Sequence, residues 1–104
     1  MAEIKMPPRR KLRPLHPGEL WQEILEDHLK LSVANAAERM GVTRQSLYAV
    51  LRGEAKVTAE MALRFGRLAG TAPQLYLNMQ SERDLWDAEE RLADVLKRIK
   101  PPAA

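Results

Sequence analysis

Residues 32–54 read SVANAAERMGVTRQSLYAVLRGE, and they carry the clearest structural signal in the chain. It predicts two short helices, over 33–40 and 44–52, separated by a turn of only three residues. Gly41 can adopt the left-handed conformation in which helices commonly end, and Thr43 can cap the next helix with its hydroxyl group. Two short helices joined by a tight, glycine-containing turn form a helix-turn-helix.

Small and apolar residues stand where this motif needs them. Ala37 lets the two helices cross closely, and Val42 brings an apolar side chain to the space between them just after the turn. Leu47 and Val50 give the second helix an inward face at helical spacing. The same pattern could form a helical hairpin that binds no nucleic acid, so the outer face of the second helix becomes the deciding feature.

That outer face carries the donors that a helix in the major groove needs near its N-terminus. Arg44 can pair bidentately with guanine, and Gln45 can pair with adenine. Flanking residues can hold phosphates, since a helix N-terminus favours an anion. The predicted DNA-binding residues are Ser32, Thr43, Arg44, Gln45, Ser46, Tyr48, Ala49, Arg52 and Lys56.

Three of these residues have a second interpretation that involves no DNA. Thr43 can act as a helix cap alone. Tyr48 can stack on the first helix of the motif instead of contacting DNA. Ala49 is small enough to approach a thymine methyl group or to touch nothing.

The remainder of the chain predicts three more helices and no strand, which makes the fold class an all-α five-helix bundle. One helix is expected over 17–29, another over 59–69, and an extended C-terminal helix from 74 to about 99. Residues 1–14 combine basic side chains with three prolines and are predicted to be a flexible tail. Residues 15–100 then form one domain.

Composition narrows the possible functions. A chain of 104 residues with 45% hydrophobic and 30% charged side chains is globular rather than disordered. The absence of cysteine excludes disulfides and thiolate metal sites. Neither histidine, His16 or His28, has a ligand-spaced or triad-like partner nearby in sequence. We therefore expect no catalytic residue, metal or cofactor, and the chain is not expected to be an enzyme.

Two further expectations come from the apolar residues. No apolar run reaches the length of a membrane span, so a soluble cytoplasmic protein without membrane contact is expected. With one Phe, two Trp and two Tyr in the sequence, the core is expected to consist of aliphatic residues.

Beyond the helix-turn-helix, the motifs resemble one family. The run over residues 15–80 is similar to the HigA-type antitoxins of the Xre helix-turn-helix superfamily. The pieces that carry the resemblance are HPGE at 16–19, LRGE at 51–54, TAEMALRFGRLAGT at 58–71 and PQLYLNMQ at 73–80. Family members often carry a polar residue where this chain has Val33, which weakens a DNA-contacting role for that position.

The resemblance implies a specific function, which composition alone does not indicate. It implies a lambda-repressor-like fold and a homodimer that binds a palindromic operator in double-stranded DNA and represses its own operon. It also implies a toxin partner of the HigB type, usually a RelE-like RNase that cleaves mRNA, which the antitoxin neutralises. The alternative is a stand-alone Xre-type transcriptional repressor without a toxin.

An apolar stripe with heptad spacing lies along the predicted last helix, and this spacing predicts a dimerisation seam. A two-fold dimer would match a palindromic operator. The other possibility is that the stripe packs on the core of its own chain. The residues of the stripe are Leu85, Ala88, Leu92, Val95 and Ile99.

Overall fold

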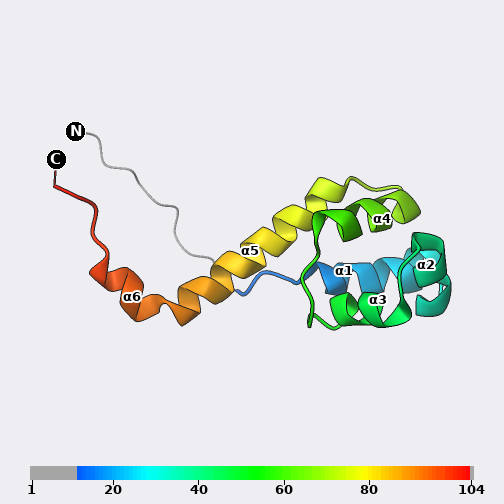
Figure 1. Cartoon of the computed structure of the whole chain (residues 1–104), viewed down its shortest axis with the longest axis horizontal. Coiled ribbons are helices and arrows are strands. Elements are labelled where there is room, and N and C mark those ends of the chain that lie inside the picture. Colours follow the sequence, from blue (N-terminus) through cyan, green and yellow to red (C-terminus); the bar gives the residue numbers. More distant parts are fainter. Residues whose placement is uncertain (1–11, 104) are drawn as a thin grey trace.

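The computed structural model describes residues 12–103, which contain helices and no strand. In order, the helices are α1 (Pro17–Glu23), η1 (Ile24–Leu29), α2 (Val33–Met40), α3 (Arg44–Leu51), α4 (Ala59–Ala69), α5 (Pro73–Arg91) and α6 (Ala93–Arg98). Helices α1 to α4 gather at one end of the molecule, and α5 leads away from them to α6 (Figure 1). We call residues 14–80 the head and residues 81–99 the arm.

The HPGE sequence starts α1 and docks it on α3. The Nδ1 atom of His16 accepts a hydrogen bond from the Gly18 backbone N–H at 2.9 Å, and the Glu19 carboxylate accepts one from the His16 backbone N–H at 3.2 Å. This reciprocal pair is a capping box. A side chain at Gly18 would collide with the Val50 carbonyl oxygen of α3, so glycine is required for the close contact between the helices.

The helix predicted over 17–29 is helical throughout, but its winding widens after Glu23 into the π-helix η1. It ends at Lys30, whose φ of 54° is left-handed and turns the chain toward α2. The wider winding leaves Leu25 in the core. Apolar spacing alone does not distinguish this winding from a regular α-helix.

The centre of the head core is aromatic, so the expectation of an aliphatic core is wrong there. Trp21 stacks on Phe65 with 4.1 Å between ring centroids, and Tyr76 meets both rings edge-on at 5.4 and 5.6 Å. All three are fully buried and come from α1, α4 and α5. Aliphatic side chains surround them, namely Leu25, Ala36, Ala37, Met40, Leu47, Val50, Leu51, Val57 and Ala62.

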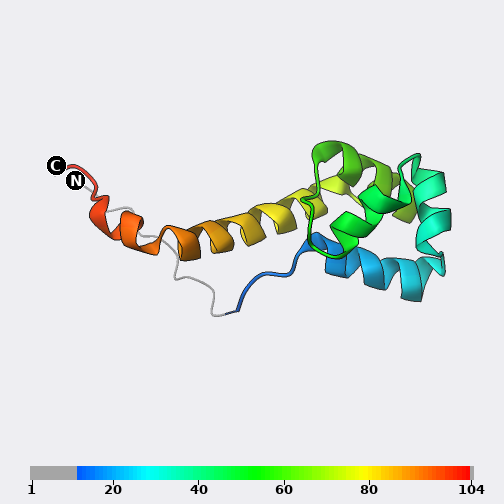
Figure 2. The same cartoon turned by 60° about the horizontal axis from the view of Figure 1, so that its bottom comes forward.

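The predicted last helix is two helices rather than one. α5 ends at Arg91, Leu92 takes φ −101° and ψ 10°, and α6 begins at Ala93. Figure 2 shows the change of direction between them. The break contains neither glycine nor proline, so no sequence signal predicts it. The all-α class, the helix-turn-helix and the extended C-terminal helix are confirmed.

The flexible tail predicted for residues 1–14 lies outside the described residues as far as residue 11. Arg13 and Pro14, which are described, contact α5: an Arg13 Nη2 lies 2.8 Å from Asp87 Oδ1, and the Pro14 carbonyl accepts a hydrogen bond from Arg83 at 3.0 Å. Within residues 12–103, no helix has the length and apolar character needed to cross a membrane.

Candidate nucleic-acid interface

Helices α2 and α3 form the helix-turn-helix that the sequence predicts, with its caps in place. Ser32 caps α2 by accepting a hydrogen bond from the Asn35 N–H at 3.1 Å. Gly41 ends α2 with φ 72°, and Thr43 caps α3 by accepting from the Ser46 N–H at 3.0 Å. α3 ends one residue earlier than predicted. Side-chain caps and one left-handed glycine therefore define the motif locally.

The outer face of α3 presents free donors at its N-terminal end. Arg44 and Gln45 are exposed, and within the described part of the chain neither takes part in an ion pair. With Thr43 and Tyr48 they line a shallow hollow in the surface. The structure thus brings the two predicted base-reading residues together on one accessible surface.

Other members of the predicted set have contacts within the motif. The Thr43 hydroxyl lies 2.6 Å from the Ser46 hydroxyl, so the cap and the neighbouring serine share a hydrogen bond. Tyr48 is 41% exposed, and the Arg52 guanidinium lies 5.1 Å above its ring, which is a cation–π contact. Ala49 is half-buried beside the turn that follows α3.

Two residues considered for DNA contact also have contacts within the chain. The Lys56 ammonium lies 3.5 Å from the Asp84 carboxylate of α5, so this cation has an acidic partner within the chain. Val33 is half-buried and packs against the core. The remaining backbone-contacting candidates, Ser32 and Arg52, are exposed beside α2 and α3.

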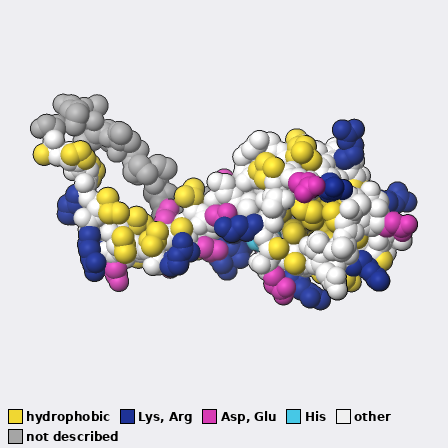
Figure 3. Space-filling model, viewed as in Figure 1, with side chains coloured by type: hydrophobic (Ala, Val, Ile, Leu, Met, Phe, Trp, Pro, Cys, Tyr) yellow, Lys and Arg dark blue, Asp and Glu magenta, His cyan; other side chains and the backbone are white. Residues whose placement is uncertain are grey.

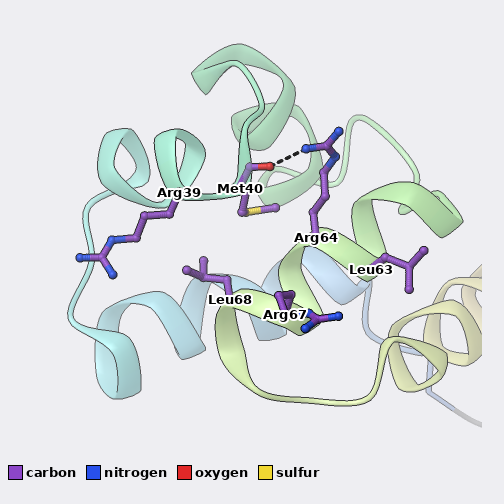
Figure 4. A pocket seen from close by; sticks show the side chains of 6 residues that line it. All are labelled: Arg39, Met40, Leu63, Arg64, Arg67 and Leu68. Carbon is purple, nitrogen blue, oxygen red and sulfur yellow. Dashed lines mark hydrogen bonds between the residues drawn. The ribbon is translucent and has the colours of Figure 1, made fainter.

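The sequence analysis missed two side chains that hold this motif in place. Arg64 of α4 donates a hydrogen bond to the Met40 carbonyl at 2.7 Å, next to the turn of the motif (Figure 4). Its guanidinium also pairs with the Glu60 carboxylate at 3.1 Å. Gln80 of α5 accepts a hydrogen bond from the Val57 N–H at 2.9 Å. The four-residue spacing of Glu60 and Arg64 is a sequence signal for their pair, whereas the two distant contacts have none.

His16 is the titratable group that the fold perturbs. Burial lowers the pKa of its imidazole, and the Arg83 guanidinium lowers it further, while a hydrogen bond with the Ala55 backbone and the charges of Glu19 and Asp84 act in the opposite direction. The Nδ1 atom can accept from the Gly18 N–H only when it carries no proton. The cap and the burial therefore both favour the neutral ring.

The predicted seam lies outside the core of its own chain. Hydrophobic side chains gather on the arm near α6 (Figure 3), and Leu85 and Ile99 are 61% and 66% exposed. Leu92 sits at the break, so the stripe is divided between α5 and α6 instead of following one helix. Whether a second copy covers this surface stays a prediction.

Residues 22–74 match the family described as Helix-turn-helix, which is more than half of the chain. The chain belongs to this helix-turn-helix family. It is 31% identical over 91 residues to an uncharacterized HTH-type transcriptional regulator of Haemophilus influenzae, covering 86% of this chain and 85% of that one. By name, this relative is a transcriptional regulator of the helix-turn-helix type.

Solved structures confirm the resemblance to HigA. An addiction module antidote protein of the HigA family from Coxiella burnetii superposes on this chain with a TM-score of 0.80 and 32% identity. The match covers 88% of this chain and 100% of that one. The Pseudomonas aeruginosa antitoxin HigA, solved with the higBA promoter, has a TM-score of 0.75 and 31% identity over 88% of this chain and 100% of its own. The lambda-repressor-like architecture is thus that of HigA antitoxins.

Proposed function

We propose that this chain is a cytoplasmic antitoxin that binds operator DNA as a homodimer, represses its own operon and neutralises a RelE-like toxin of the HigB type. The observation that carries the proposal is the exposed N-terminal end of α3, where Arg44 and Gln45 have no partner among the described residues. The P. aeruginosa HigA solved with its promoter supports the same use of the fold.

Each contact with DNA has a chemical reason. The Arg44 guanidinium matches the two acceptors O6 and N7 of guanine, and the Gln45 amide matches N6 and N7 of adenine. Ser46 and Ala49 lie on the same helix and would complete the contact with the major groove. Ser32 and Arg52 would hold phosphates on either side, which fixes the register without reading sequence.

The arm is the part of the chain to which we assign the two-fold dimer. A palindromic operator needs two copies of α3 related by a two-fold axis. The exposed apolar residues from Leu85 to Ile99 offer a surface that a second copy of the arm could bury. We therefore assign dimerisation to the arm and base reading to the head.

Gel-shift titration on the DNA upstream of the chain's own reading frame tests the DNA-binding part. The wild-type protein should retard this fragment in the presence of excess unrelated DNA, and Arg44→Ala should lose the specific complex. Glu38→Ala is the matched control, because Glu38 is exposed on α2 and has no predicted role in base reading. A wild-type protein that binds the upstream fragment no better than unrelated DNA would contradict the proposal.

A stand-alone repressor is the second candidate, and the H. influenzae relative, a transcriptional regulator by name, favours it. The two candidates make opposite predictions for the adjacent reading frame. An antitoxin should co-purify with the product of that frame and rescue cells from its toxicity. A stand-alone repressor should bind its operator equally well but do neither.

A further inference from the structure

One buried side chain fastens α5 to the segment that follows α3. Gln80 is only 6% exposed, and its Oε1 atom accepts a hydrogen bond from the Val57 backbone N–H at 2.9 Å. Val57 is a core residue in the segment between α3 and α4, so its N–H is not part of the hydrogen-bond pattern of either helix. A buried N–H without an acceptor is costly, and Gln80 therefore fixes the position of this segment against α5.

The same side chain continues into a second contact. Gln80 donates from Nε2 to Asp84 Oδ1 at 3.0 Å, and Asp84 Oδ2 lies 3.5 Å from the Lys56 ammonium. Two consecutive residues after α3 are thus joined to two consecutive turns of α5. The inner hydrogen bond is buried and the outer ion pair is exposed, so the inner one carries more of the restraint.

The next turn of α5 is fastened to the segment before α1. Arg83 donates to the Pro14 carbonyl at 3.0 Å and lies 3.5 Å from Asp87, which in turn pairs with Arg13 at 2.8 Å. The stretch 80–87 therefore contacts both the segment before α1 and the segment between α3 and α4. We call this stretch the junction.

The first turns of α5 are anchored in the head by the buried Tyr76, and the junction adds polar contacts with the head further along the same helix. No residue after Asp87 is buried in the described chain, so these contacts lie where α5 leaves the core. The distance from Gln80 to Leu92 is about 18 Å of helix at 1.5 Å per residue. A tilt of about 10° at the junction would move one end relative to the other by roughly 3 Å, close to the rise of one base pair, about 3.4 Å.

We infer that the junction, through Gln80 and Asp84, sets the spacing between operator half-sites that the dimer accepts. This inference rests on the proposed function, because it requires two copies on one operator. In such a dimer the arms pair and the two recognition helices lie at a distance fixed by the junction angle. Gln80 and Asp84 are positioning residues that determine spacing, whereas Arg44 and Gln45 determine base sequence.

Equilibrium binding to a set of full-length operators tests the inference. The duplexes carry identical half-sites at the natural spacing or with one base pair added or removed. We expect the wild-type dimer to prefer the natural spacing by about tenfold or more, in line with the cost of misplacing specific contacts. Gln80→Leu should reduce this ratio to about threefold or less while the preference for the correct half-site bases is unchanged.

Gln74→Leu is the matched control. Gln74 lies on the same helix and makes the same type of hydrogen bond to the residue four positions ahead, Asn78, but that bond is exposed and reaches no other element. This variant should keep the wild-type spacing ratio. If Gln80→Leu folds poorly, Asp84→Ala removes the outer half of the junction and leaves the Gln80–Val57 hydrogen bond intact. Its spacing ratio should fall between those of the wild type and the loosened junction.

The outcomes separate the inference from the proposed function. Folded, dimeric variants of Gln80 and Asp84 that retain the wild-type spacing ratio would overturn the inference and leave the proposed function standing. A wild-type protein that binds single half-sites as tightly as paired ones would contradict the dimeric function itself, and the inference would fall with it. Circular dichroism and analytical ultracentrifugation establish the fold and the oligomeric state of each variant.

Discussion

The head and the arm of this molecule are both helical, but they are stabilised by different means. The head contains every buried hydrophobic residue of the described chain, from Trp21 to Tyr76. The arm contains no buried residue, and its exposed large apolar side chains are Leu85, Leu92, Val95, Leu96 and Ile99. The head therefore has a core of its own, whereas the arm combines the backbone hydrogen bonds of its helices with the polar contacts of the junction and an exposed apolar surface.

This difference assigns folding and base reading to the head and association between chains to the arm. Substitutions in the head should change folding and base reading within one chain. Substitutions in the arm should change association between chains and leave the fold in place.

The largest expected effect is on the aromatic centre of the head. Trp21→Ala removes a fully buried side chain that stacks on Phe65, and it should lower the free energy of unfolding by about 3–5 kcal/mol. Val95→Ala on the arm should change it by less than about 0.5 kcal/mol when measured on the monomer. Urea titrations followed by circular dichroism measure both. Similar losses for the two variants would remove the distinction between head and arm.

Next in size is the effect of a charge on the arm. Leu92→Asp should yield a folded monomer, because Leu92 is outside the core and a charge in a buried seam is costly. DNA affinity should then collapse, since one half-site supplies too few contacts. Sedimentation equilibrium with circular dichroism reports both properties. A variant that remains a folded dimer would move the two-fold axis away from the arm.

Within the head, base reading and phosphate binding should also separate. Arg44→Ala should lose about 1–3 kcal/mol of binding free energy and relax the sequence preference at one position. Lys56→Ala should lose less and weaken all sequences alike, because the Lys56 ammonium already has Asp84 as a partner. Binding to a randomised operator library at two salt concentrations measures both. An unchanged library profile for Arg44→Ala would mean that α3 is not the reading helix.

The smallest effect is a dependence of stability on pH. The folded state lowers the pKa of His16, so the unfolded chain takes up the proton first as the pH falls. Stability should decrease as the pH drops below the ordinary histidine value of about 6.5, and level off once the folded form is also protonated. Denaturation curves measured from about pH 5 to about pH 8 follow this trend, because the range extends about one and a half pH units on each side of the ordinary histidine pKa.

An asparagine at position 16 could cap α1 with its side chain but carries no titratable group. His16→Asn keeps a side-chain acceptor for the Gly18 N–H and should lose the pH dependence that His16 confers. His28→Asn is the control, since His28 is the other histidine of the sequence and is exposed. A wild-type trend that survives His16→Asn would assign it to another group.

The sequence predicts the helix-turn-helix well because its signals are local. Caps at Ser32 and Thr43, the left-handed Gly41 and the inward apolar residues all lie within about six turns of helix, so each constrains its neighbours directly. The exposed residues of α3 follow from the same periodicity. Their outward position is therefore part of the prediction rather than a separate guess.

Long-range contacts could not be predicted in the same way. Nothing in the spacing of Trp21, Phe65 and Tyr76 says that the three rings meet, because they come from helices far apart in sequence. The contact of Arg64 with Met40 and that of Gln80 with Val57 depend on how the helices pack. These side chains connect elements, and a periodic pattern describes one element at a time.

Footprinting on the chain's own upstream DNA reports base reading by the head and pairing of the arms in one experiment. We expect two protected half-sites related by a two-fold axis, with centres one helical turn apart, roughly 34 Å, or a multiple of that distance. Leu92→Asp should abolish both protections together, since neither head binds stably alone. A single asymmetric patch of protection in the wild type would rule out a two-fold dimer that reads DNA with α3.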